Sequence, residues 1–207
     1  MNYINYTLIT VMVSVIGLSD LRHKYSTCGP LQITVIQIDY SKLEKIPDEI
    51  YDCLNLETLN LYDNQLSFVS NRILNLTKLT SLNLSGNNFT VFPEVICQMT
   101  QLESLYIQRN RIDYIPDTIS QLINLEELYI WDNNIDSIPD SIQNLTKLKA
   151  LYICDNNIEL LPPLPDSCDN ISIKNNPLRI LNKLRKSNNG ELPCAMIEYE
   201  ISKDIYN

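Results

Sequence analysis

Three tyrosines recur at one fixed interval in the middle of the chain. Tyr106, Tyr129 and Tyr152 are 23 residues apart, and the single tryptophan, Trp131, lies two positions after the second of them. Glutamates and aspartates flank these aromatic residues in the sequence. Aromatic rings surrounded by carboxylates bind arginine and lysine side chains through cation–π contacts and charge pairing. We therefore expect a protein partner that presents a basic residue near the centre of its contact surface.

The candidate partner-binding residues share this spacing or lie beside it. They are Tyr62, Tyr106, Tyr129, Trp131, Tyr152, Glu103, Arg109, Glu126, Glu127, Asp132 and Asp155. Clustered aromatic residues are typical of binding hot spots. Tyrosine and tryptophan also favour β-strands, where same-face neighbours stabilise a sheet without any ligand. The residue types leave both interpretations open.

Thiol and imidazole chemistry has little support in the sequence. The six cysteines are scattered, none forms a C-x-x-C pair, and the only histidine is His23. This pattern lacks the usual spacing of zinc ligands and a base for a serine or cysteine nucleophile. No phosphate-binding glycine loop is present. The sequence therefore predicts no metal, no cofactor and no catalytic residue.

The overall charge restricts the class of partner. The net charge is −9 and the isoelectric point is about 4.6. Nucleic-acid binding requires a basic surface, so this balance argues against it. An acidic chain remains well suited to a basic protein partner.

A repeated unit must position the aromatic residues, and its clearest copy covers residues 125–147. A shift of 23 residues in either direction meets the same residue types, and a period of this length indicates a solenoid. In Leu128-Tyr129-Ile130 two apolar residues alternate with an outward one, as in a strand. Pro139 suits the first turn of a short helical segment on the opposite side. The apolar positions of this copy are Leu125, Leu128, Ile130, Ile135, Ile138, Ile142 and Leu145.

An asparagine ends each predicted strand, where the chain must turn. Its amide can bond backbone groups of the turn and of the neighbouring coil. We therefore expect a structural ladder of side chains running through the solenoid. Its members are Asn64, Asn87, Asn110, Asn133, Asn156 and Asn176.

The spacing L-x-x-L-x-L-x-x-N-x-L, in seven copies from residue 33 to 181, resembles the leucine-rich repeat family. The 23-residue copies with I-P in the middle are similar to Ras-group intracellular repeats. One 20-residue copy, with L-P-P-L-P at 161–165, resembles repeats of bacterial effectors. The resemblance implies an α/β solenoid: a right-handed superhelix with a concave parallel sheet and a convex side of short helical or extended segments. It also implies protein recognition on the concave face.

The N-terminal region has three open interpretations. Residues 6–18 are apolar but short for a membrane span, and residues 1–5 contain no lysine or arginine. The segment suits a buried cap helix, the core of a signal peptide or a membrane anchor. Cys53 and Cys168 occupy core positions, which fits thiols in a reducing compartment. We expect a cytoplasmic protein, or a secreted or membrane-anchored one if residues 1–19 act as a signal.

The predicted organisation has three parts. Residues 1–32 form the N-terminal apolar segment and cap, 33–181 the seven repeats, and 182–207 a C-terminal cap and acidic tail. The expected function is a non-enzymatic scaffold that binds a protein partner on the concave face. A secreted recognition protein is the alternative, and its sequons would be glycosylated. A ubiquitin-ligase-like enzyme using Cys194 is a weak third hypothesis, suggested by the resemblance to bacterial effectors.

Overall fold

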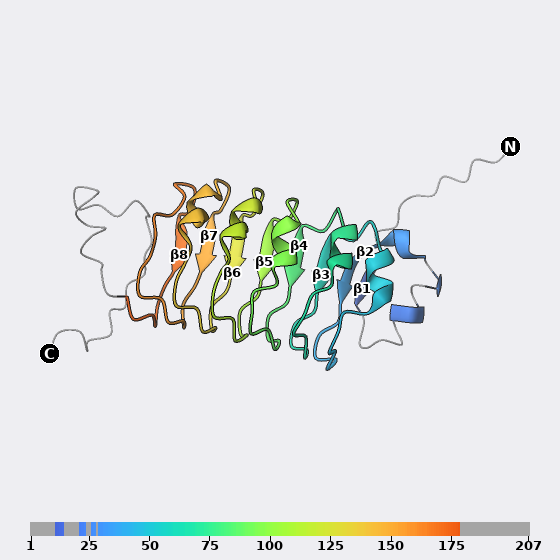
Figure 1. The fold of residues 1–207 in the computed structure, drawn as a ribbon. Helices are drawn as coiled ribbons and strands as arrows, with labels where there is room; N and C mark the ends of the chain where they lie inside the picture. Colours follow the sequence, from blue (N-terminus) through green and yellow to red (C-terminus); the bar gives the residue numbers. More distant parts are fainter. Residues whose placement is uncertain (1–10, 15–20, 24–25, 28, 179–207) are drawn as a thin grey trace.

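The computed structural model describes residues 11–14, 21–23, 26–27 and 29–178, and in this part of the chain eight short strands form one parallel sheet. Each strand pairs only with its neighbours in sequence. Figure 1 shows them side by side, from the blue N-terminal end on the right to orange β8 on the left. The strands are β1 (Val11–Ser14), β2 (Ile33–Gln37), β3 (Thr58–Asn60), β4 (Ser81–Asn83), β5 (Ser104–Tyr106), β6 (Glu127–Tyr129), β7 (Ala150–Tyr152) and β8 (Asn170–Ser172).

Short 3₁₀ helices form the opposite side of the coils. The predicted α/β solenoid is therefore confirmed, including its short helical or extended return segments. Between β7 and β8 the described chain has no helix, because the prolines of the 161–165 run favour an extended backbone. The helices are η1 (Pro30–Gln32), η2 (Asp48–Asp52), η3 (Asn71–Asn75), η4 (Glu94–Gln98), η5 (Asp117–Gln121) and η6 (Asp140–Asn144).

The repeated proline stands just outside the helix rather than in its first turn. Pro139 is the N-cap of η6, and its carbonyl oxygen accepts the Ile142 N–H at 3.0 Å. Pro47, Pro93 and Pro116 have the same place before η2, η4 and η5. The proline ring therefore fixes the approach to the helix, while its carbonyl forms the first helical hydrogen bond.

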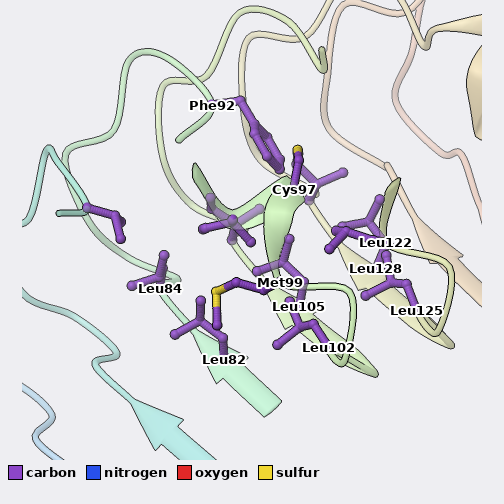
Figure 2. Packing of buried hydrophobic residues seen from close by; sticks show 14 of the residues in the cluster. Leu82, Leu84, Phe92, Cys97, Met99, Leu102, Leu105, Leu122, Leu125 and Leu128 are labelled. Atoms are coloured by element: carbon purple, nitrogen blue, oxygen red, sulfur yellow. The ribbon is translucent and has the colours of Figure 1, made fainter. Parts of the chain in front are cut away.

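The apolar positions of the repeat form one continuous core. Leu128 and Ile130 are fully buried, as are their counterparts in the neighbouring coils. The register aligns Leu82 with Leu105 and Leu105 with Leu128, and Figure 2 shows these side chains following one another along the interior. Each coil alone would leave this face in water, so stacking of successive coils supplies the stability.

The asparagines at the strand ends connect successive coils. The Asn133 side-chain oxygen accepts the N–H of Ile112 at 3.0 Å, from the preceding coil. Its Nδ2 donates to the carbonyl oxygens of Ile107 at 3.2 Å and Ile130 at 3.1 Å. One buried side chain thus satisfies backbone groups of two coils. Asn64, Asn87, Asn110, Asn156 and Asn176 make equivalent bonds.

The residue before each of these asparagines has a left-handed backbone. At this position φ lies between 51° and 66°, a region that glycine, asparagine and aspartate tolerate best. The repeat spacing did not predict this conformation, although most residues at the position are of these types. The residues before the asparagines are Asp63, Gly86, Arg109, Asp132, Asp155 and Asn175, and Tyr40 takes the same conformation before Ser41 in the first coil.

The described part of the N-terminal segment is extended. Val11–Ser14 form β1, which pairs in parallel with β2 and aligns Ser14 with Gln37. The expected cap helix is therefore wrong for these four residues, since the backbone here extends the sheet instead. Residues 1–10 and 15–20 lie outside the described part, as do the C-terminal cap, the acidic tail and Cys194.

The four cysteines of the described chain form no disulfide bond. Cys53, Cys97 and Cys168 are buried, and Cys154 is half-buried on the sheet side. Burial raises the pKa of the Cys53 thiol to about 11 and also raises the pKa of the Cys97 thiol. Both side chains are therefore neutral, apolar components of the core at physiological pH.

Candidate protein-binding surface

The exposed side of the sheet, here called the strand face, carries the predicted aromatic residues. Its backbone register places Tyr106 opposite Tyr129 and Tyr129 opposite Tyr152, on β5, β6 and β7. Side chains at successive positions of a strand point to opposite sides of the sheet. Each tyrosine follows a buried leucine and precedes a buried isoleucine, so the three tyrosines point outward in one column.

The three tyrosine rings form a continuous stack. The ring centroids of Tyr106 and Tyr129 are 4.7 Å apart at an interplanar angle of 19°. Those of Tyr129 and Tyr152 are 4.4 Å apart at 8°. Both faces of the Tyr129 ring are consequently covered by its neighbours. Only Tyr106, on the β4 side, and Tyr152, on the β8 side, keep a ring face that the stack itself does not cover.

Hydrogen bonds hold the stack at both ends. The Tyr106 hydroxyl donates to Glu127 Oε2 at 3.0 Å, and Asn170 Nδ2 donates to the Tyr152 hydroxyl at 2.7 Å. Burial, followed by the Glu127 charge, raises the pKa of Tyr129 to about 12. Burial also raises the pKa of Tyr106. The stack is therefore neutral at physiological pH and does not repel an anionic or cationic ligand.

Carboxylates surround the stack, and only some have a basic partner. Glu126 pairs with Lys149 at 2.6 Å, although both side chains are substantially exposed. Glu103 and Asp132 are exposed and form no salt bridge with any residue that the structure describes. Asp155 Oδ1 accepts a hydrogen bond from an amide of the next coil, at 2.6 Å. The surface around the rings thus retains net negative charge.

Two predicted residues belong to a separate cluster rather than to the stack. Arg109 Nη1 donates to the Tyr62 hydroxyl at 2.7 Å, two coils back along the solenoid. Tyr40 packs edge-on against Tyr62, with centroids 5.3 Å apart at 89°. Tyr40 was not predicted, because its position holds aspartate, glycine or arginine in the following coils. The candidate surface therefore has two centres, the tyrosine stack and the Arg109–Tyr62–Tyr40 cluster.

A glycine lies in the coil that Arg109 crosses to reach Tyr62. Gly86 has φ +66°, and a Cβ there would come within 3.3 Å of the Asp63 backbone and 3.4 Å of the Tyr62 ring. Its lack of a side chain lets Tyr62 lie close to the backbone of this coil. The spacing alone did not predict this contact.

Trp131 lies two residues after Tyr129, just past the end of β6, in the next outward column. It is half-buried, and its neighbours in that column are Gln108 and Cys154. The ring pairs of the stack do not include it. Trp131 therefore widens the aromatic surface of β6 rather than extending the row of stacked rings.

Known proteins share the repeat. The family model for leucine rich repeats matches residues 32–89, 55–112 and 100–158. The chain belongs to the leucine-rich repeat family. Among curated proteins, no sequence matches it.

Solved structures show the same leucine-rich repeat fold. A leucine-rich repeat protein of Leptospira interrogans is 23% identical, with a TM-score of 0.57. The alignment covers 83% of this chain and 56% of that one. At this identity the likeness shows the fold alone.

A metal site and a membrane span each require a particular group of residues. No three histidine, cysteine, aspartate or glutamate side chains in the described ranges are placed to hold a metal ion. In the same ranges, no helix has both the length and the apolar composition needed to cross a bilayer. Leucine-rich repeat domains are generally protein–protein interaction modules. The strand face is the candidate surface for such an interaction in this chain.

Proposed function

We propose that this leucine-rich repeat protein is a non-enzymatic scaffold whose strand face binds a basic segment of a protein partner. The observation that carries the proposal is the tyrosine stack of β5–β7 with carboxylates around it. Rigid aromatic rings give a large contact area at low cost in side-chain entropy. The stack is already ordered, so a partner does not have to order it on binding.

The charges favour arginine or lysine on the partner. Glu103 and Asp132 have no salt bridge in the described chain, and Glu127 is held beside the stack by Tyr106. A guanidinium group could bond a carboxylate and lie flat on an open ring face at the same time. The ring faces available for this are the outer ones of Tyr106 and Tyr152. Tyr129 then contributes its ring edge and hydroxyl.

The Arg109–Tyr62–Tyr40 cluster supports recognition of an orientation as well as of a charge. Arg109 is exposed, and its guanidinium is held in place by the Tyr62 hydroxyl. Neighbouring parallel strands are about 4.8 Å apart, so β3 and β7 are separated by roughly 19 Å. A partner that follows the strand face would meet the Arg109 guanidinium beside Tyr62 at one end and the carboxylates around the tyrosine stack at the other. A reversed partner would meet like charges.

Affinity capture from a cell lysate tests the strand face. Immobilised wild-type protein is compared with a Tyr129→Ala/Trp131→Ala variant, and bound proteins are quantified by mass spectrometry. Leu54→Ala/Ile123→Ala is the matched control, because it removes two exposed apolar side chains elsewhere. We expect a basic partner that the control retains and the aromatic variant loses. A partner retained equally by all three proteins would remove the strand face from consideration.

One observation favours the secreted alternative. Four described asparagines in N-x-S/T sequons have exposed side chains, so an oligosaccharyltransferase could reach them if the chain were exported. The buried cysteines, which form no disulfide bond, instead support a cytoplasmic location. The mass and N-terminal residue of the protein from its native source distinguish the two. An intact Met1 without glycan mass contradicts secretion. The sequon residues are Asn75, Asn88, Asn144 and Asn170.

A further inference from the structure

Three large apolar side chains are exposed at the same place in three successive coils, between the strand and the 3₁₀ helix. Phe68, Val91 and Tyr114 are 23 residues apart and expose 69%, 51% and 39% of their surface. We call this row the apolar stripe. Polar residues bound it at equivalent positions, Lys45 on one side and Ser137 on the other. Exposed apolar side chains at neighbouring places mark interaction sites more often than isolated ones do.

The stripe has a depression in it rather than a flat surface. A hollow of about 260 Å³ lies between the first two coils of the stripe. Phe68, Val91, Pro93 and Val95 form its apolar walls, and Glu94 lies at its edge. A branched or aromatic side chain of a partner would fill such a hollow and be removed from water there.

Carboxylates lie in the Val91 and Tyr114 coils of the stripe. Glu94, Asp113 and Asp117 are exposed and make no salt bridge with the residues that the structure describes. Glu94 and Asp117 open η4 and η5, three positions after Val91 and Tyr114. Arg111 is the basic residue nearest to Tyr114 in the sequence, and with it the three carboxylates still leave these two coils with a net negative charge.

The coil of Phe68 lacks this negative charge. The equivalent helix-opening residue is Asn71, which is neutral. Arg72 in the same helix bonds Asp48 at 2.8 Å and lies 3.7 Å from Asp52, so these two acids of the preceding coil already face a basic side chain. The negative charge of the stripe therefore lies in its Val91 and Tyr114 coils.

From these charges we infer that the apolar stripe is a second docking surface, separate from the strand face, for a basic amphipathic segment of a protein partner. The apolar side chains of that segment cover Phe68 and Val91. Its lysines or arginines face Glu94, beside the hollow, and Asp113 and Asp117 in the Tyr114 coil. A second copy of the chain is a poor occupant, because both copies carry a net charge of −9 and repel each other. An anionic membrane surface is disfavoured for the same reason.

A synthetic amphipathic helix of leucine and lysine, carrying a fluorescent label, is the probe. Its binding to the full-length chain is followed by fluorescence anisotropy. We expect Phe68→Ser/Val91→Ser to weaken binding by about tenfold. Leu54→Ser/Ile123→Ser removes exposed apolar surface outside the stripe and should change affinity less than about twofold. Glu94→Gln/Asp117→Asn should weaken binding and reduce its dependence on salt.

Further controls distinguish an amphipathic segment from the other possible ligands of the apolar stripe. A lysine and serine peptide of equal charge should bind much more weakly than the amphipathic probe. Equal losses in the stripe and Leu54/Ile123 variants, or none in the stripe variant, would overturn the inference. Weakening by Tyr129→Ala/Trp131→Ala alone would place the probe on the strand face, which would leave the proposed function intact and refute the stripe. Self-association that Phe68→Ser/Val91→Ser abolishes in sedimentation experiments would identify a second copy as the occupant instead.

Discussion

Tyr129 and Tyr152 stack on the strand face with their ring centroids 4.4 Å apart and their planes 8° from parallel. Tyr106 covers the opposite face of Tyr129 at 4.7 Å. The central ring therefore stabilises the sheet and also sets the distance between the two open ring faces. The sheet-ladder and binding-site interpretations are compatible here, because the same ring contacts serve both.

Replacing the central ring should therefore reduce stability. Tyr129→Ala removes two stacking contacts, each worth about 0.5–1.5 kcal/mol, so we expect a loss of about 1–3 kcal/mol in the free energy of unfolding. Urea denaturation followed by circular dichroism measures it. Tyr129→Phe keeps both stacks and should retain most of the stability. Equal losses in the two variants would show that the hydroxyl, rather than ring stacking, is responsible.

Gly86→Ala should disturb both the backbone and the Arg109–Tyr62–Tyr40 cluster. Gly86 has φ +66°, and a new Cβ would lie 3.3 Å from the Asp63 backbone. We expect a destabilisation of about 1–3 kcal/mol, from left-handed strain and crowding together. Gly86→Asn is the matched control, since asparagine tolerates a left-handed backbone better than alanine but adds the same Cβ. Urea denaturation of both variants separates the two causes, and equal losses would exclude a role for left-handed strain.

The period of the sequence was enough to predict which residues share a column. A 23-residue shift preserves the strand register, so Tyr106, Tyr129 and Tyr152 had to lie beside one another once the coils stacked. The period could not predict side-chain torsions. Tyr129 is stacked on both faces, and Arg109 bonds the Tyr62 hydroxyl. Both contacts depend on side-chain rotamers, which the surrounding packing selects.

The repeat pattern did not predict the apolar stripe, for a different reason. Its position holds lysine, phenylalanine, valine, tyrosine, serine and leucine in successive coils, so no single residue type repeats there. Phe68 stands next to the core residue Val69, and the sequence alone does not separate an exposed apolar residue from a buried one beside it. Only the placement of Phe68, Val91 and Tyr114 on one side of the coils reveals a surface.

Replacing a single asparagine of the ladder should lower the free energy of unfolding substantially. Asn133→Ala leaves the buried N–H of Ile112 without its acceptor and removes donors from two carbonyl groups. An unsatisfied buried polar group costs about 1–3 kcal/mol, so we expect a loss of roughly 2–4 kcal/mol in the free energy of unfolding. Asn134→Ala is the control, because it changes the exposed neighbouring residue. The Asn134 side chain makes a long hydrogen bond of 3.4 Å to the Arg111 carbonyl oxygen, so its loss should change stability little. Similar losses at both positions would contradict a specific role for the ladder.

The buried thiol of Cys53 should make the solenoid less stable at alkaline pH. Burial raises its pKa from 9.0 to about 11 in the folded chain, so the folded state holds the proton more tightly than the unfolded state. Its contribution is complete below the unfolded pKa of about 9 and is lost as the pH rises through about 11. The loss is roughly 2 to 3 kcal/mol, since each pKa unit corresponds to about 1.4 kcal/mol.

Urea denaturation of wild type and Cys53→Ala between pH 7 and pH 11 measures this loss. The variant starts from a lower stability at pH 7, because alanine leaves a small cavity in the core. Its free energy of unfolding should then fall less steeply above pH 9 than that of the wild type. Tyr129, with a pKa raised to about 12, titrates in both proteins and gives them a common decline at the upper end. Parallel curves over the whole range would mean that the Cys53 thiol ionises equally well in the folded and unfolded chain.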